Sequence, residues 1–228
     1  MNIPKACFFD LDGVLLDTEP IHQEAWFRSA KAYGKVITTE ELITLKGRRR
    51  IDCAKQIIDS LNKSVELQDF LEYYQSIILN MLTDVPAIQG AKNLVKKIIE
   101  AGISVALVSS SSKESFINKT KNHPWLNDIN IKVLGDDPLL NRGKPYPDPY
   151  LLAAQKLNVE PIDSWAIEDS ESGSYSALRA GCKVWCIQTD VKLRNKIIKE
   201  TNISNTNLTI IDNLIEIEKK LEFLIQST

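Results

Sequence analysis

From residue 86 onward, short apolar runs alternate with stretches of helical periodicity, and this alternation constrains the fold more than any other feature. The runs expected to be strands are 103–109, 131–135, 164–169, 183–187 and 208–211. The helices expected around them are 89–101, 112–121, 147–158, 172–181 and 214–224. Strands that alternate with helices of roughly 10 to 15 residues form βαβ units, in which parallel strands make a sheet covered on both faces. We therefore predict an α/β fold with a doubly wound parallel sheet.

The first expected strand lies far from the others along the chain, in the apolar run from Ala6 to Phe9. Between about Glu19 and Met81, apolar residues recur only at helical spacing, and residues 38–41 have the pattern of a helix capping box. An all-helical stretch inserted after the first strand has to form a small domain of its own. We predict a core domain at 1–16 and 86–228 and a helical cap domain at 17–85.

Charge and composition exclude several partners. The 228 residues include 28 Lys and Arg and 30 Asp and Glu, so the net charge is -2. A chain with this charge has no general attraction to nucleic acid or to anionic membranes. No apolar run reaches the roughly 20 residues of a membrane span, and the N-terminus lacks the pattern of a signal peptide. The four cysteines form no CxxC pair, which favours reduced thiols. We expect a cytoplasmic monomer that binds neither nucleic acid nor membranes.

Polar residues follow the expected strands at the points where the strands end. They are Asp10 and Asp12 after the first strand, Ser109 after the second, Glu168 and Asp169 after the fourth, and Lys144 before a helix. Each could be an ordinary turn residue. In an open parallel sheet, however, the carboxyl ends of the strands share one edge, where ligands bind. Several carboxylates without a sulfur or imidazole cluster favour a hard cation, and Mg²⁺ suits phosphate substrates.

The charges of these residues predict how such a site would work. Asp10, Asp12, Glu168 and Asp169 contribute -4, while Mg²⁺ and Lys144 contribute +3. The remaining -1 would repel a phosphate dianion. If Asp12 enters the reaction protonated, as a general acid must, the balance becomes zero. Asp10 is then left as the nucleophile that forms an aspartyl-phosphate.

Four segments, in this order and at this spacing, resemble the motifs of the haloacid dehalogenase superfamily of aspartate-nucleophile phosphatases. They are DLDGVLLDTE at 10–19, VALVSSS at 105–111, GKPYPDPY at 143–150 and IEDSESG at 167–173. The resemblance covers nearly the whole chain and implies a Rossmann-like core. The helical insertion resembles the cap of the subgroup that contains β-phosphoglucomutase and many sugar-phosphate phosphatases.

The resemblance also implies residue roles. Asp10 would be the nucleophile and Asp12 the acid/base. The Asp10 carboxylate, the Asp12 backbone carbonyl and Asp169 would hold Mg²⁺, with Glu168 as a ligand or a partner of one. Ser109, Ser110 and Lys144 would bind the phosphoryl group. In the cap, His22 and Arg50 match positions that assist proton control and phosphate binding in the mutase, although His22 could equally be a surface residue.

The resemblance leaves three functions open. We expect an Mg²⁺-dependent phosphatase acting on a sugar, polyol or nucleoside monophosphate. A phosphosugar mutase is the first alternative, but the mutase's cap lysine falls near Tyr74, and this chain has no lysine between Lys63 and Lys92. A non-catalytic phosphate-binding protein is the second, although a binding module has no need for an acid/base. The aromatic residues Trp26, Tyr33 and Tyr74 are expected to form cap core.

Overall fold

The structure is a computed structural model that describes residues 2–61, 63–79, 81–82, 85–200 and 207–227. Within these residues, six parallel strands form one sheet in the order β3-β2-β1-β4-β5-β6. The strands are β1 (Ala6–Phe9), β2 (Ser104–Val108), β3 (Ile131–Val133), β4 (Ser164–Glu168), β5 (Lys183–Ile187) and β6 (Leu208–Ile211). The chain reverses direction across the sheet at β1, so the order is that of a doubly wound fold.

The first strand lies in the middle of the sheet, which explains its uniformly apolar sequence. All four residues of β1 are buried, because strands pair on both of its edges and helices pack on both of its faces. Phe9, its last residue, is in register with Leu107 of β2 and Ile167 of β4. The residues that follow these three strands therefore meet at one edge of the sheet.

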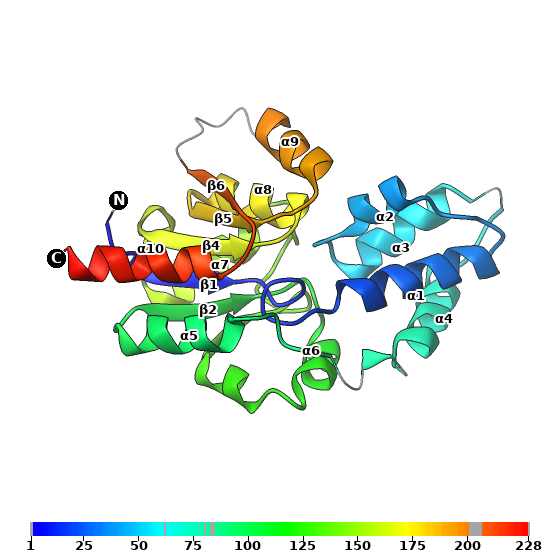
Figure 1. Cartoon of the computed structure of the whole chain (residues 1–228). Coiled ribbons are helices and arrows are strands. Elements are labelled where there is room, and N and C mark those ends of the chain that lie inside the picture. The colour runs from blue at the N-terminus through cyan, green and yellow to red at the C-terminus, as the bar shows by residue number, and fades with distance from the viewer. Residues whose placement is uncertain (1, 62, 80, 83–84, 201–206, 228) are drawn as a thin grey trace.

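Two helical layers cover the sheet (Figure 1). One face packs against α5 (Ala91–Glu100) and α10 (Ile215–Gln226), and the other against α7 (Asp148–Leu157) and α8 (Glu171–Ala180). Helix α6 (Lys113–Thr120) follows β2 at the end of the sheet that faces the cap. Alternate residues of β1 point to opposite layers: Phe9 packs in the layer of α5 and α10, and Phe8 packs in the layer of α7 and α8.

Among the described residues between β1 and α5, four helices lie beside the sheet and not on either of its faces (Figure 1). They are α1 (Glu19–Ala32), α2 (Thr39–Leu45), α3 (Arg50–Asp59) and α4 (Leu67–Leu79). The capping box expected at residues 38–41 is present at the start of α2. Trp26 and Tyr74 stack between α1 and α4 with ring centroids 3.7 Å apart, and Tyr33 packs against Phe70.

The α/β fold and its all-helical insertion are as predicted. The domain boundaries stay a prediction; the second boundary, at 85/86, adjoins Asp84, which lies outside the described residues. One helix was missed: α9 (Val191–Glu200). Its sequence has charged residues throughout, and although Ile197 is buried, Val191 and Ile198 are exposed.

The remaining global features concern membranes and thiols. In the part of the chain that the structure describes, no helix combines the length and apolar character needed to cross a membrane. Cys7, Cys53, Cys182 and Cys186 are all buried and free.

Candidate active site

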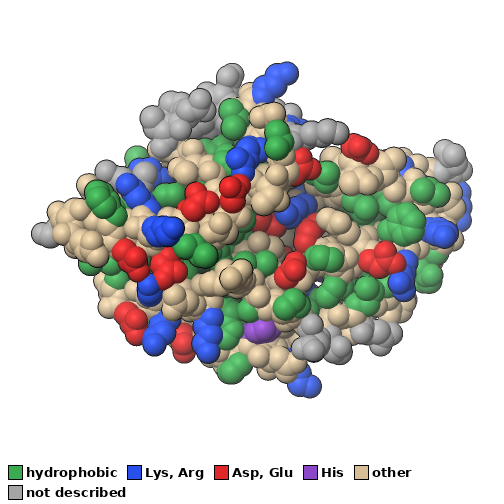
Figure 2. Space-filling view, in the orientation of Figure 1, with side chains coloured by type: hydrophobic (Ala, Val, Ile, Leu, Met, Phe, Trp, Pro, Cys, Tyr) green, Lys and Arg blue, Asp and Glu red, His purple; other side chains and the backbone are tan. Residues whose placement is uncertain are grey.

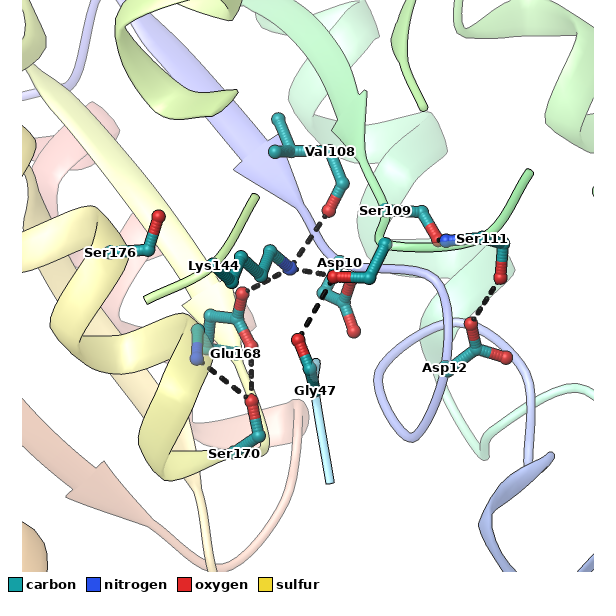
Figure 3. A network of polar contacts seen from close by, with 12 residues as sticks. Asp10, Asp12, Gly47, Val108, Ser109, Ser111, Lys144, Glu168, Ser170 and Ser176 are labelled. Carbon is teal, nitrogen blue, oxygen red and sulfur yellow. Dashed lines mark hydrogen bonds and ion pairs between the residues drawn. The ribbon is translucent and has the colours of Figure 1, made fainter. Parts of the chain in front are cut away.

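The structure brings the predicted residues from the strand ends together at one edge of the sheet (Figure 3). The Lys144 ammonium donates hydrogen bonds to Asp10 Oδ1 at 2.8 Å, to Glu168 Oε1 at 2.6 Å and to the carbonyl oxygen of Val108 at 3.0 Å. Lys144 therefore ties together the ends of β1, β2 and β4. All three charged side chains are almost completely buried.

Burial and pairing determine the charge states of this group. Burial raises the pKa of Asp10 well above its usual value, and the Lys144 ammonium offsets this only in part. Burial would lower the pKa of Lys144, but the Asp10 and Glu168 carboxylates outweigh that effect and raise it above its usual value. The ammonium is thus charged at neutral pH and is held against Asp10.

Glu168 and Asp169 are neighbours with different surroundings. Glu168 accepts hydrogen bonds from Lys144, Ser170 and the Tyr150 hydroxyl, so both of its oxygens are engaged. Neither oxygen of Asp169 accepts a hydrogen bond of normal geometry, although the Lys46 ammonium lies 2.8 Å from Oδ2. Burial, partly offset by Lys46, raises the pKa of Asp169 to about 7.

Three carboxylates have the placement of a metal site. Oxygens of Asp10, Glu168 and Asp169 lie within 4.8 Å of one another, and all three residues are buried. Carboxylate oxygens are the ligands that Mg²⁺ prefers. The buried oxygens of Asp169 accept no hydrogen bond of normal geometry, and the Lys46 ammonium already lies against one of them. The residues present therefore fit a hard divalent cation, with the oxygens of Asp169 more available to it than those of Glu168.

Asp12 lies away from this group, in a cluster of its own (Figure 3). Its Oδ2 accepts a hydrogen bond from the Ser111 hydroxyl at 2.9 Å, and its Oδ1 accepts from the Lys119 ammonium at 2.6 Å and from the Thr18 hydroxyl. His22 Nε2 lies 3.7 Å from Oδ1. Burial alone would raise the pKa of Asp12, but Lys119 and then His22 outweigh it and hold that pKa well below its usual value.

This cluster changes the charge balance from which a protonated Asp12 was inferred. That balance counted one lysine, Lys144, whereas Lys119 pairs with Asp12 and Lys46 pairs with Asp169. With the two additional ammonium groups and a divalent cation, the site is net positive even when Asp12 is ionised. The charges therefore give no reason for Asp12 to be protonated before phosphate binds, and the inference is withdrawn.

The loop between α2 and α3, residues 46–49 and here called the cap loop, reaches from the cap into the core site. Lys46 pairs with Asp169, and the carbonyl oxygen of Gly47 accepts a hydrogen bond of 2.9 Å from the Ser110 hydroxyl. Ser110 thus contacts the cap, whereas the Ser109 hydroxyl stays in the core, accepting a hydrogen bond from the Ser111 amide at 3.1 Å. Gly47 has φ 72°, and a Cβ there would lie 2.0 Å from Ser170 Oγ.

A cavity of about 80 Å³ separates the core from the cap. Figure 2 shows charged side chains of both signs around a hollow where the two parts meet. Core residues Asp10, Asp12, Ser110, Ser111 and Lys119 line it on one side. Cap residues Glu19, His22, Gln23, Trp26, Lys46, Arg48, Arg50 and Tyr74 are among those that line it on the other.

Both cap residues expected near the substrate line this cavity, but each has a protein partner. The Arg50 guanidinium donates a hydrogen bond to Gln75. His22 Nδ1 lies 2.6 Å from the Tyr74 hydroxyl, and burial together with the nearby Lys119 lowers the pKa of His22, so the ring is neutral at pH 7. Trp26 and Tyr74 combine two roles, because they are buried cap core and also form a wall of the cavity.

Sequence reasoning missed the roles of Lys119 and Ser111 and did not predict that Lys46 would pair with Asp169. Lys119 lies within a polar helix of weak amphipathic pattern, so nothing marks it as buried. Ser111 belongs to a run of four serines, 109–112, whose members point in different directions. The one available signal was position: Ser111 follows a strand end by only a few residues.

Comparisons with known proteins show the family to which the chain belongs. Residues 7–187 match the family model of haloacid dehalogenase-like hydrolases. The chain is 30% identical to the phosphorylated carbohydrates phosphatase of Thermotoga maritima, over 78% of this chain and 82% of that protein. It is 29% identical to (DL)-glycerol-3-phosphatase 1 of Arabidopsis thaliana, over 77% of this chain but 61% of that protein, so it spans less than two thirds of this relative.

A solved structure of β-phosphoglucomutase from Clostridium difficile has the same fold. Its TM-score to this chain is 0.78, over 98% of this chain and 99% of that one, at 23% identity. The likeness therefore includes the helices α1 to α4 as well as the sheet. Since the family model spans most of the sequence, including every strand end that builds the site, this chain belongs to the family of haloacid dehalogenase-like hydrolases.

Proposed function

We propose that this protein is a phosphatase that hydrolyses a small phosphorylated metabolite through an aspartyl-phosphate on Asp10. The observation that carries the proposal is the pairing of Asp10 with Lys144, 2.8 Å apart and buried, beside Ser109 and the Asp169 carboxylate. A carboxylate held at the carboxyl edge of a parallel sheet, with cationic groups around it, suits nucleophilic attack on a phosphoryl group.

The roles of the other residues follow from their placement. Lys144 and Ser109 would bind the phosphoryl oxygens, and Ser110 would bind them or hold the cap loop. In the first step, an Asp10 oxygen attacks phosphorus and the ester oxygen leaves, taking from Asp12 a proton that this carboxylate accepts when the phosphomonoester binds as its monoanion. In the second step, a water oxygen attacks the aspartyl-phosphate, its proton passes to Asp12, and Asp10 is released with inorganic phosphate.

Mg²⁺ is the cofactor that the donor set supports best. The Asp10 and Asp169 carboxylates would hold it, together with the backbone carbonyl of Asp12. Glu168 would orient Lys144 through the hydrogen bond between them. When bound, the ion neutralises phosphoryl charge and orients the phosphoryl group for attack.

The substrate class is proposed from the cavity and the relatives together. The cavity under the cap is lined by residues of both core and cap, which suits a small phosphomonoester enclosed between them. The relatives named above act on phosphorylated carbohydrates and on glycerol 3-phosphate. We propose a sugar or polyol phosphate, contacted in the cap by Arg50 and His22, with a nucleoside monophosphate as the wider possibility.

A phosphosugar mutase is the second candidate, because a structural neighbour is β-phosphoglucomutase and Arg50 lines the cavity. Against it, Tyr74 of α4 stacks on Trp26 where the mutase resemblance requires a cationic residue. We therefore prefer hydrolysis.

We also propose that the protein is a cytoplasmic monomer of two domains. The core domain comprises residues 1–16 and 86–228, and the cap domain comprises residues 17–85. Light scattering in solution tests the oligomeric state.

The test of the proposed function is turnover of p-nitrophenyl phosphate with Mg²⁺. We expect Mg²⁺-dependent release of phosphate by the wild type and a loss of at least about 10³-fold in Asp10→Asn, since the amide keeps the volume but cannot form the acyl-phosphate. Asp128→Asn, an exposed site on the core, is the matched control and should keep full activity. A wild type that binds inorganic phosphate without turnover would instead identify a non-catalytic phosphate-binding protein.

A further inference from the structure

Lys119 is a buried lysine whose position calls for a functional explanation. Only 2% of its surface is exposed, although it lies in the last turn of α6, a helix with a mostly polar sequence. A buried ammonium is costly unless it is paired and hydrogen-bonded. Its partners are Asp12 Oδ1 at 2.6 Å and Ser111 Oγ at 2.9 Å. The charge of Lys119 is therefore directed at one carboxylate, that of Asp12.

Lys119 and Ser111 together define the orientation of that carboxylate. Ser111 accepts a hydrogen bond from Lys119 and donates one to Asp12 Oδ2, so the three side chains form a closed triangle. Each oxygen of Asp12 thus has one donor from this pair. A carboxylate held at both oxygens has little freedom to rotate, and such restraint is what a proton-transferring group requires.

The contacts of Asp12 come from two parts of the molecule. Ser111 follows β2 and Lys119 lies on α6, so both belong to the same body as the sheet. Thr18 and His22 lie at the start of α1, the first cap helix. If the cap moves away from the core, Thr18 and His22 can move with it, whereas Lys119 and Ser111 stay with Asp12.

We propose that Lys119, with Ser111, is a positioning residue that holds Asp12 in place while water cleaves the aspartyl-phosphate. This inference rests on the proposed function. The step transfers a proton from the attacking water to Asp12, forms the new phosphorus–oxygen bond and breaks the bond to Asp10. Water has to enter for this step, so the base must keep its position when the cap is not closed over it. A pair of donors from the core meets that need.

The first experiment is Lys119→Met, which keeps most of the side-chain volume and removes the ammonium. With p-nitrophenyl phosphate and Mg²⁺, the good leaving group makes phosphorylation of Asp10 easy, so a misplaced Asp12 should slow the second step. We expect kcat to fall about 10- to 100-fold, with a burst of p-nitrophenol and accumulation of phosphorylated enzyme in acid-quenched mass spectra. Lys121→Met, an exposed site one residue after α6, is the matched control.

A double-mutant cycle separates positioning from a merely structural role. In an Asp12→Asn background, Lys119→Met should lower kcat by less than about twofold, because the group that it positions is gone. Equal losses in both backgrounds, or a slow variant without phosphorylated enzyme, would overturn the inference. If Lys119→Met does not fold, Ser111→Ala carries the test, with an expected loss of about 3- to 10-fold; full kcat in that variant would overturn it.

Failure of this inference differs from failure of the proposed function. A wild type that turns over p-nitrophenyl phosphate while Lys119→Met keeps its full kcat overturns the inference alone. A wild type without turnover overturns the proposed function, and the inference with it.

Discussion

At the residue scale, Gly13 shows how closely the backbone approaches the metal-binding candidates. It follows Asp12 with φ 78°, in the left-handed region that favours glycine. A Cβ at this position would lie 1.7 Å from Asp169 Oδ2, far inside van der Waals contact. A side chain here is therefore excluded twice, by the backbone conformation and by the Asp169 carboxylate.

A comparison of Gly13 with Gly34 tests the effect of the close approach to the Asp169 carboxylate. Gly13→Ala should displace the Asp169 carboxylate and lower Mg²⁺-dependent kcat/KM for p-nitrophenyl phosphate by about 100-fold or more, since small misplacements at a reacting centre are costly. Gly34 has φ 91° with nothing near its missing Cβ. Gly34→Ala should therefore lose about 1 kcal/mol of unfolding free energy and keep its activity.

The two variants are compared by kinetics and by chemical denaturation. If Gly13→Ala behaves like Gly34→Ala, with reduced stability but unchanged kcat/KM, then the position of Asp169 is not critical for turnover. Such a result would count against Asp169 as a metal ligand.

At the scale of elements, the cap loop (residues 46–49) is the segment by which the cap touches the core site. Lys46 pairs with Asp169, Gly47 accepts a hydrogen bond from Ser110, and the Arg49 side chain packs where a Cβ of Gly143 would lie. The loop also holds three cationic side chains that trypsin recognises. Its accessibility to protease therefore reports how often it leaves the core.

Removing the Ser110 hydroxyl should loosen this loop. A hydrogen bond of this kind contributes about 1 kcal/mol, so Ser110→Ala should raise the rate of tryptic cleavage within residues 46–50 about fivefold. Ser76→Ala is the matched control, because the Ser76 hydroxyl bonds to the Tyr73 carbonyl within α4. The cleavage site is read by mass spectrometry. Equal cleavage rates in the two variants would mean that the Ser110 bond does not hold the loop.

At the scale of the whole molecule, the two connections between cap and core run side by side. The Asp17 amide donates to the Pro86 carbonyl at 2.9 Å, and the Ile88 amide donates to the Leu15 carbonyl at 3.0 Å. Leu16 and Ala87 form an antiparallel bridge between the two segments. Two adjacent connections of this kind suit a hinge, which could close the cap over the substrate and later admit water.

A hydrolase and a mutase differ in whether cap movement lets water reach the aspartyl-phosphate, and the reaction products distinguish the two enzymes. A hydrolase must admit water to the aspartyl-phosphate, whereas a mutase must exclude it until a second sugar hydroxyl arrives. With glucose 1-phosphate and a bisphosphate primer, we expect inorganic phosphate as the main product. Glucose and glucose 6-phosphate are followed by coupled enzymatic assays, with Asp10→Asn as the blank. Accumulation of glucose 6-phosphate ahead of phosphate would establish the mutase instead.

Much of this architecture could be predicted because it depends on local order along the chain. The period of the apolar residues distinguishes strands from helices, and parallel strands necessarily end at one edge of a sheet. The proximity of Asp10, Ser109 and Glu168 could therefore be inferred without coordinates. Helix α9 was not predicted, because charged residues run through its whole sequence and two of its apolar residues, Val191 and Ile198, are exposed.

The sequence by itself determined the α/β fold, the helical insertion and the polar edge of the sheet, since each follows from the spacing of residues within one element or between successive strands. The tertiary structure alone decided which charges meet across elements. Lys119 reaches Asp12 over 107 positions, and Lys46 reaches Asp169 from the cap. Such pairs depend on how whole helices and loops are oriented in space, and that orientation is set by packing over the entire core, which no local pattern records.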